Sequence, residues 1–117
     1  GYSHVAIVPA GRQVHLSGQV ALDAGGALIG GGDLAAQAEQ VYRNVKAGLA
    51  AAGADLSHVF KVVTYVVDLD ADKAAIVRAV RQRHLGDGPF PASTMVGVPA
   101  LVDPRLLIEI EVIASLD

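Results

Sequence analysis

A stripe of apolar residues at intervals of three and four follows Asp33. Its members are Leu34, Ala38, Val41, Val45, Leu49 and Ala52. Because this spacing gathers the side chains on one face of a helix, it predicts an α-helix that ends near Gly53. Asp33 is a favourable N-cap residue for this helix.

A second helix is predicted between two groups of residues that favour helix ends. Asp68 to Asp70 supply side chains that cap a helix at its N-terminus, and Gly86 to Pro89 should end it. The helix carries the apolar residues Ile76, Val77 and Val80.

Runs of β-branched and aromatic residues predict the strands. Two short strands, Ser3 to Val8 and Val14 to Ser17, are separated by Pro9-Ala10-Gly11, so we expect a hairpin at the start of the chain. Three further strands are expected at Val59 to Val67, Thr94 to Val98 and Leu106 to Ala114.

The predicted order is strand, strand, helix, strand, helix, strand, strand. This order indicates an α+β fold with a mostly antiparallel or mixed sheet and two helices on one face. At 117 residues the chain is long enough for one compact core. Residues 1–117 are therefore expected to form a single domain.

Alternation along a strand indicates which residues share a face of the sheet. In the strand from Val59 to Val67 one face carries Phe60, Val62 and Val66, and the other carries Val59, Val63, Tyr65 and Val67. In the last strand one face carries Leu106, Ile108, Ile110 and Val112, and the other carries Leu107, Glu109, Glu111 and Ile113. Both faces of the sheet are thus largely apolar.

Two helices can cover only one of these faces. An exposed apolar face of several strands exceeds what a soluble monomer usually tolerates, so the second face requires a partner. A further copy of the chain is the natural candidate, and composition alone does not choose between a dimer and a trimer.

Composition narrows the classes of function. Hydrophobic residues make up 52% of the chain and charged residues only 18%, which fits additional burial between subunits. The formal charge is −3 and the nine Lys and Arg residues are scattered, so nucleic acid is not an expected partner. No apolar run reaches the ~18 residues of a membrane span. The absence of cysteine excludes disulfides and fits a cytoplasmic protein, while the start at Gly1 leaves open native residues upstream.

Glu109 and Glu111 are the sharpest candidates for chemistry. They point to the same side of the last predicted strand and have apolar neighbours there. A partly buried carboxylate in such a place can orient or deprotonate a water molecule. Ion pairing at an interface, or simple exposure to solvent, is the competing interpretation.

Other kinds of site find little support in the sequence. The histidines form no HxH or HExxH pattern, so no metal site is expected; they are His4, His15, His58 and His84. No GxSxG motif marks a nucleophilic serine. The glycines at 30 to 32 precede a helix but lack the lysine of a phosphate-binding loop, so they are expected to form a flexible connection. No cofactor is expected.

Six separated motifs resemble those of the RidA/YjgF family, in the same order along essentially the whole chain. They are Gly1-Tyr2-Ser3-His4, Leu16-Ser17-Gly18-Gln19-Val20, Asn44-Val45-Lys46, Val67-Asp68-Leu69, Phe90-Pro91-Ala92 and the stretch from Leu107 to Ala114. Each motif is weak alone, whereas six in order are specific.

This resemblance implies a chorismate-mutase-like fold and a homotrimer whose sheets surround a central barrel, with small-molecule clefts between subunits. The family's deaminases hydrolyse enamines and imines to keto acids and ammonia. An arginine holds the substrate carboxylate, and a glutamate near the C-terminus positions the attacking water. By the match of motifs, Glu109 corresponds to that glutamate, Tyr2 to a tyrosine at the cleft mouth, and Ser17 and Gly18 to backbone that lines the pocket.

The chain departs from the family at the arginine. The family has a segment like P-A-R-T/S, whereas this chain has Pro91 to Thr94 as P-A-S-T, which puts Ser93 in the arginine's place with Thr94 beside it. A serine hydroxyl offers one neutral donor, whereas a guanidinium offers two parallel charge-assisted hydrogen bonds worth roughly 1.5–3 kcal/mol each. Arg12 and Arg105 have no predicted route into the cleft.

Two functions are consistent with these features. The first is a divergent enamine or imine deaminase-like hydrolase that uses Glu109 and an ordered water, with standard activity on 2-aminoacrylate weakened by Ser93. The alternative is a trimer that binds metabolites in its clefts, or regulates through them, without catalysis. Ribonuclease activity, which is sometimes attached to the family, ranks below both because the chain lacks a basic groove.

Overall fold

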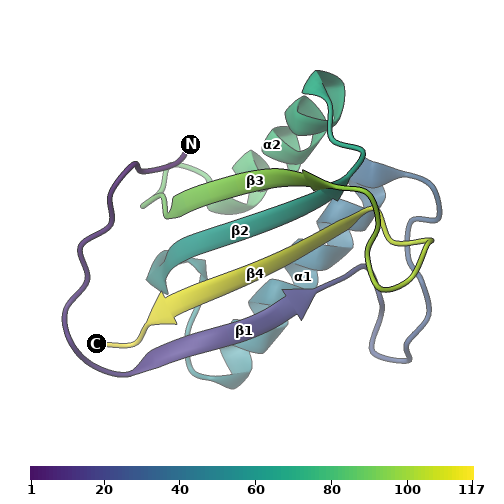
Figure 1. The fold of residues 1–117 in the computed structure, drawn as a ribbon. Helices are drawn as coiled ribbons and strands as arrows, with labels where there is room; N and C mark the ends of the chain where they lie inside the picture. Colours follow the sequence, from purple (N-terminus) through teal and green to yellow (C-terminus); the bar gives the residue numbers. More distant parts are fainter.

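The computed structural model describes residues 1–117 as a four-stranded sheet with two helices against one of its faces (Figure 1). The strands are β1 (Gln13–Gln19), β2 (Val59–Val67), β3 (Ala92–Val98) and β4 (Ile108–Ser115). The helices are α1 (Leu34–Ala51) and α2 (Ala71–Leu85), and a 3-10 turn, η1 (Leu56–His58), leads into β2. The sheet order is β1-β4-β2-β3, with β4 antiparallel to both neighbours and β3 parallel to β2. The expected α+β class and mixed sheet are confirmed.

The first helix occupies the segment that the apolar stripe predicts. The side chain of Asp33 accepts a hydrogen bond from the N–H of Ala36 at 3.2 Å and caps the helix. Gly53 follows the C-terminus with φ of +81°, a left-handed conformation that favours glycine. The stripe is buried apart from its last member, Ala52, which is exposed. No helix of the structure combines the length and the apolar composition needed to cross a membrane.

The second helix is capped by Asp70, whose carboxylate accepts a backbone hydrogen bond of 2.8 Å in the first turn. Of its three predicted apolar residues, Val77 and Val80 are buried, whereas Ile76 is 39% exposed. An α-helix has 3.6 residues per turn, so residues three and four positions apart share a face. Arg81, four positions after Val77, therefore lies on the buried face with the two valines, and Ile76 does not.

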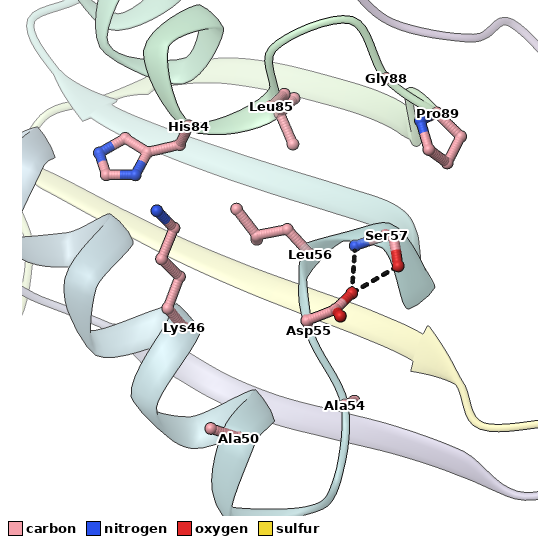
Figure 2. Close-up of a pocket in the computed structure, with 10 residues that line it drawn as sticks. All are labelled: Lys46, Ala50, Ala54, Asp55, Leu56, Ser57, His84, Leu85, Gly88 and Pro89. Carbon is pink, nitrogen blue, oxygen red and sulfur yellow. Dashed lines mark hydrogen bonds between the residues drawn. The ribbon is translucent and has the colours of Figure 1, made fainter.

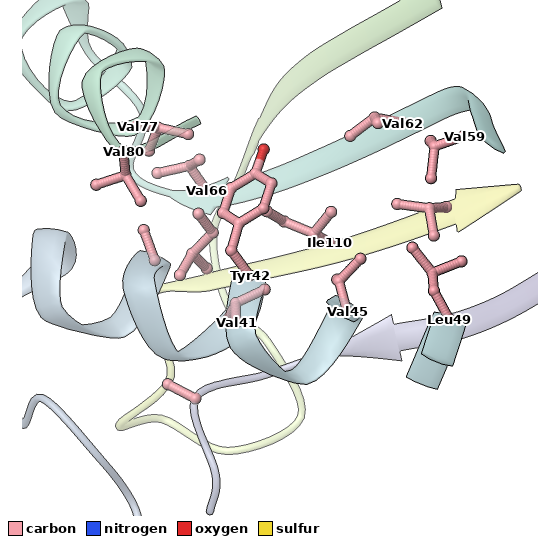
Figure 3. Close-up of a cluster of buried hydrophobic side chains, with 14 of the residues drawn as sticks. Val41, Tyr42, Val45, Leu49, Val59, Val62, Val66, Val77, Val80 and Ile110 are labelled. Atoms are coloured by element: carbon pink, nitrogen blue, oxygen red, sulfur yellow. The ribbon is translucent and has the colours of Figure 1, made fainter. Parts of the chain in front are cut away.

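Both helices bury their apolar faces on the same side of the sheet (Figure 3). α1 packs on β4 and β1, and α2 packs beside α1. On that side of β4, Ile108, Ile110 and Val112 are at most 2% exposed, whereas Glu109 and Glu111 on the other side are half-buried. The alternation predicted for the last strand is confirmed, although the strand begins at Ile108, two residues later than expected.

Strand β2 departs from simple alternation at its start. The ladder with β4 skips Phe60 between Val59 and Lys61, which forms a β-bulge. Val59 is therefore buried together with Val62 and Val66, while Phe60 is half-buried. The predicted grouping, which joined Phe60 to the covered face and put Val59 on the other, is wrong because the extra residue shifts the alternation by one.

The N-terminal segment does not form the expected hairpin with β1. Between Ser3 and Val8 the only pairing is an isolated parallel bridge from Ser3 to Ala92, at the start of β3. Val5 and Ile7 are 74% and 94% exposed. The segment crosses the end of the sheet from β3 to β1 (Figure 1), so its tether at β3 draws it away from the strand that it was expected to join.

The opposite face of the sheet has no covering element, and Figure 1 views the molecule from that side. There β2 presents Val63 and Tyr65, and β4 presents Glu109, Glu111 and Ile113. This uncovered face mixes apolar and acidic side chains.

Candidate functional site

Glu109 projects from β4 onto the uncovered face and lies against the backbone of Gly18 in β1. A β-carbon at position 18 would overlap the Glu109 carboxylate, so the glycine makes room for it. Glu109 forms no hydrogen bond or ion pair within the chain, whereas Glu111 accepts a hydrogen bond of 2.9 Å from the hydroxyl of Tyr65. Glu109 is therefore the free carboxylate of the pair.

The main chain beside this carboxylate is irregular. The ladder between β1 and β4 is regular up to Leu16 and resumes at Gln19, so Ser17 and Gly18 form a bulge. Bulges bend a strand, redirect its side chains and are common next to active sites. The structure thus brings Ser17 and Gly18 together with Glu109.

Tyr65 contacts one of the two glutamates and leaves the other free, because its hydroxyl donates a hydrogen bond to Glu111 and not to Glu109. Its hydrogen bond to Glu111 is the main cause of a raised pKa of the Tyr65 hydroxyl, and the charge of Glu109 contributes in the same direction. The tyrosine therefore remains protonated and occupies Glu111 as an acceptor, while Glu109 stays available to a ligand.

A groove of about 320 Å³ crosses the uncovered face over β1, β4 and β2. Its polar lining includes His15, Ser17, Lys61 and Glu111. Nowhere does the chain gather three or more histidine or acidic side chains in a group that could hold a metal ion.

Ser93 and its neighbour Thr94 face opposite sides of β3. Thr94 pairs in register with Val63 and accepts a hydrogen bond of 3.1 Å from Lys61 Nζ, on the uncovered face. Ser93 pairs in register with Val62, on the side of the helices. Adjacent residues of a strand must diverge in this way.

Ser93 opens on a cavity of about 220 Å³ between β3 and α2. The cavity is lined by Tyr2, Arg78, Arg81, Ser93 and Met95. Arg81 Nη1 lies 3.5 Å from Ser93 Oγ, and Tyr2 is 53% exposed. The structure therefore joins Tyr2 and Ser93 with two arginines that the sequence did not single out.

Arg81 carries a buried positive charge without a counter-ion. It is 5% exposed and takes part in no ion pair. The phenol of Tyr42 is also buried, and this burial raises the pKa of Tyr42 to about 12, an effect that the nearby Arg81 charge opposes. The charge of Arg81 thus acts inside the helix layer as well as at the cavity.

The predicted site residues form two groups that a single chain does not bring together. Glu109, Ser17 and Gly18 lie on the uncovered face at β4 and β1, while Tyr2 and Ser93 lie at the β3 edge on the helix side. Strand β2 stands between the groups, and its register places Glu109 and Ser93 roughly 14 Å apart along the sheet.

Neither of the two arginines considered from the sequence reaches these groups. Arg12 pairs with Asp117 at 2.9 Å, and Arg105 pairs with Asp103 at 2.8 Å. Side-chain hydrogen bonds from these arginines are the main reason that the pKa of each carboxyl falls to about 2. Both guanidinium groups are thus engaged at the surface.

A larger cavity, of about 380 Å³, lies between α1 and α2 and contains none of the predicted site residues (Figure 2). Lys46 and His84 enter it from the two helices. His84 stacks on Tyr42 with ring centroids 5.0 Å apart, and its Nε2 lies 2.9 Å from a carboxylate oxygen of Glu39. Asp55, on another wall, caps η1. His84 and Asp55 thus have structural roles.

Arg81 belongs to no motif, but its place in the sequence is unusual. Arg81 follows Val77 by four residues and Val80 by one, so it falls on the apolar stripe of α2. A charged residue on an apolar stripe is unusual, because charged side chains are rarely buried without a partner.

Comparison with known proteins identifies a family for this chain. Residues 1–116 match the protein family described as endoribonuclease L-PSP. The crystal structure of YyfB from Yersinia pestis, a protein of unknown function in the conserved Rid family, has a TM-score of 0.90 at 44% identity, over 99% of this chain and 87% of that one.

Two related sequences extend the comparison. Protein DfrA of Myxococcus xanthus is 42% identical over 114 residues, which cover 97% of this chain and 83% of DfrA. A protein of Dermatophagoides farinae named 2-iminobutanoate/2-iminopropanoate deaminase is 32% identical over 110 residues, which cover 94% of this chain and 83% of that protein. The similarity therefore extends over most of both relatives.

Proposed function

This chain belongs to the Rid/YjgF family, and on that premise we propose that residues 1–117 form one domain of a homotrimer that hydrolyses enamines or imines in clefts between subunits. The relative named 2-iminobutanoate/2-iminopropanoate deaminase supports the substrate class, an imine next to a carboxylate. Above all, the Glu109 carboxylate supports the reaction, because it lies against the Gly18 backbone without a partner of its own.

In the proposed reaction Glu109 accepts a proton from a water molecule whose oxygen attacks the imine carbon. A C–O bond forms, the electron pair of the C=N double bond moves to nitrogen, and nitrogen takes the proton from Glu109. The hydroxyl of this carbinolamine then loses its proton, which Glu109 passes to nitrogen, so that the C–N bond breaks and ammonia leaves. One water is consumed, a keto acid remains, and an enamine enters as its imine tautomer.

The separation of the two groups of residues supports a site between chains. Glu109, Ser17 and Gly18 of one subunit would meet Tyr2 and Ser93 of the next, with Tyr2 at the mouth of the cleft. Thr94 lies on the uncovered face near Lys61 and would approach the cleft from that side. The uncovered sheet face supplies the surface on which subunits associate.

Because Ser93 stands where the family has an arginine, the proposed reaction needs another cation to bind the substrate carboxylate. A serine hydroxyl carries no charge, so turnover of an imine that bears a carboxylate requires a cation from elsewhere in the cleft. Without such a cation the second candidate function is favoured, a trimer that binds or senses metabolites without turning them over. RNA cleavage is not proposed, because the chain has a net charge of −3 and its basic residues are scattered.

The test measures ammonia release from 2-aminoacrylate generated in situ, against spontaneous hydrolysis without protein. The wild type should exceed the spontaneous rate, and Glu109→Gln should lose at least about a hundredfold of the excess, since loss of a general base typically costs that much. Glu111→Gln is the matched control, because it changes the neighbouring carboxylate that Tyr65 already occupies.

Three outcomes are distinguishable. A wild type that exceeds background and depends on Glu109 supports the hydrolase. An equal loss in both glutamine variants would assign the effect to the charge of the face and contradict the specific role of Glu109. A wild type at background over a panel of imines, including neutral ones, would reject the hydrolase and leave the binding protein.

A further inference from the structure

The cavity between α2 and β3 holds positive charge and no negative charge. Of the five side chains that line it, two are the guanidinium groups of Arg78 and Arg81 and two are the hydroxyl groups of Tyr2 and Ser93. No acidic side chain contributes to the lining. Its volume of about 220 Å³ suits a molecule of a few heavy atoms.

Arg81 is the unusual member of this lining. A buried charge is normally paired, because removal of an ion from water without compensation is costly. Arg81 is 5% exposed, has no carboxylate partner, and makes a single long side-chain contact of 3.5 Å to Ser93 Oγ. Four of its five N–H donors therefore have no partner in the chain.

These free donors are open to the cavity. The fully enclosed side-chain atoms without a partner are Tyr42 Oη, His84 Nδ1 and Ser115 Oγ, and no nitrogen of Arg81 is among them. The unpaired nitrogens therefore keep a small accessible surface, and the cavity is a hollow that Arg81 lines. An entering anion would meet a guanidinium that the helix has already oriented.

We propose that Arg81, assisted by Arg78, binds the carboxylate of a small 2-imino or 2-keto acid in this cavity. The hydroxyls of Tyr2 and Ser93 add neutral donors to the same anion. The assignment of a keto or imino acid rests on the proposed function, whereas the assignment of an anion site rests only on the lining. The arginine that is missing from β3 is thereby supplied from α2, next to the serine that stands in its place.

A carboxylate fits the lining better than phosphate does. One planar guanidinium presents two parallel N–H groups that match the two oxygens of a carboxylate. Arg78 and the two hydroxyls complete a shell for a monoanion, and no lysine or helix N-terminus is present to bind further oxygens of a phosphate dianion.

The test is a calorimetric titration of the intact protein with three probes. Pyruvate is the keto acid that hydrolysis of 2-iminopropanoate yields, pyruvamide is its neutral counterpart, and inorganic phosphate is the competing anion. Wild type should bind pyruvate at least about tenfold more tightly than pyruvamide or phosphate. Equal binding of pyruvate and pyruvamide would overturn the anion site, and tighter binding of phosphate would overturn the choice of a carboxylate.

Variants locate the charge. Arg81→Gln should weaken pyruvate binding at least about tenfold, because two charge-assisted hydrogen bonds are lost. Arg83→Gln is the matched control on the same helix, since Arg83 is exposed and lies 3.6 Å from Glu39, outside the cavity. Its binding should remain within about twofold of wild type. Unchanged binding in Arg81→Gln would overturn the proposal.

A rescue experiment protects the test against a folding defect. The double variant Arg81→Gln, Ser93→Arg returns a guanidinium to the cavity from the strand and should recover most of the lost pyruvate affinity. Circular dichroism compares the fold of each variant with wild type. If Arg81→Gln does not fold, Arg81→Lys replaces it, because lysine retains the charge without the planar guanidinium. This variant should bind pyruvate more weakly than wild type does, but more tightly than it binds pyruvamide. A pyruvate affinity equal to that of wild type would count against a specific role of the guanidinium.

Failure of this proposal is distinguishable from failure of the proposed function. Ammonia release that depends on Glu109 but not on Arg81 would leave the hydrolase and reject the carboxylate site. Pyruvate binding that depends on Arg81, in a protein that releases no ammonia, would leave the site and reject the hydrolase.

Discussion

At the scale of single residues, the candidate chemistry depends on how closely the Glu109 side chain approaches the backbone of the neighbouring strand. Glu109 reaches over the main chain of β1 only because position 18 has no β-carbon. The bulge at Ser17 and Gly18 brings that stretch of chain beneath the carboxylate. The backbone conformation does not require glycine at position 18, because its φ is outside the left-handed region. The space that the Glu109 side chain occupies is what requires it.

Gly18→Ala is therefore expected to affect catalysis more than stability. The added methyl group overlaps the end of the Glu109 side chain, which is flexible and can swing away, so the free energy of unfolding should fall by no more than about 1 kcal/mol. The displaced carboxylate should lower ammonia release at least about tenfold. Gly32→Ala is the control, because a β-carbon there meets nothing within 4 Å. Unchanged turnover in Gly18→Ala would contradict the placement of Glu109 in the reaction.

The residue scale also limits what the sequence could predict about the site. Alternation along the last strand correctly put Glu109 and Glu111 on one face, and the same rule applied to β3 separates Ser93 from Thr94. The approach of Glu109 to Gly18 depends on pairing between strands at opposite ends of the chain, and local pattern carries no information about that register. The proximity of Arg81 to Ser93 is not predicted either, because it depends on how α2 packs beside β3.

At the scale of elements, the sequence predicted best where one periodicity governs a whole segment. Both helices and the strand β2 were located within two residues, because capping residues and apolar spacing agree there. The predicted strand Ser3 to Val8 fails because β-branched residues favour a strand only when a neighbouring strand is available, and the segment is held at the start of β3. The β-bulge at Phe60 was also not predicted, because no pattern in the sequence marks it.

Two neighbouring residues of α2 test the observed orientation of the helix. Val77→Ala removes a side chain that is 1% exposed and should lower the free energy of unfolding by about 2 kcal/mol, through lost burial and a cavity. Ile76→Ala removes a larger side chain that is 39% exposed and should cost less than about 0.5 kcal/mol. Urea unfolding at one protein concentration measures both changes. Equal costs would show that α2 is rotated from its place in the structure.

The contact between α1 and α2 through Glu39 and His84 predicts a pH dependence. The hydrogen bond with His84, above all, lowers the pKa of Glu39 below its ordinary value of 4.5. Ionised Glu39 thus stabilises the folded state above that value, and the contribution is lost as the pH falls through the lowered pKa. At neutral pH, Glu39→Gln should cost about 1 kcal/mol, a modest figure because the carboxylate is 30% exposed.

Urea titrations of wild type and Glu39→Gln across the acidic range check this sign. The difference between the two proteins should shrink as the pH falls below 4.5 and through the lowered pKa of Glu39, because the side chain at position 39 then becomes uncharged in both proteins. Arg43→Gln serves as the control, because it removes only a surface contact of 3.7 Å to the same carboxylate. A difference that grows as the pH falls would contradict the assignment.

At the scale of the whole molecule, the sheet is covered by helices on one side only. The uncovered face carries Val63, Val67 and Ile113 among its acidic residues, and nothing else in the chain packs there (Figure 1). Such a face is stable in water if further copies of the chain cover it. In the proposed trimer this association would bring the Glu109 group on the uncovered face of one chain to the β3 edge of another, where the Arg81 cavity lies, so the proposed activity depends on assembly.

Val63→Glu tests this link, because Val63 lies near the middle of the uncovered face, in register with Glu111. Light scattering should find wild type at three times the chain mass of 12.0 kDa, whereas a carboxylate desolvated beside Glu111 should shift the variant toward the mass of one chain. The helix-covered core is untouched, so circular dichroism should change little, while ammonia release should be lost with the trimer. Ala47→Glu, on the exposed side of α1, should remain trimeric and active.

A wild type that is monomeric yet active would place the whole reaction within one chain. This outcome is incompatible with the roughly 14 Å that separate Glu109 from Ser93 on opposite faces of the sheet.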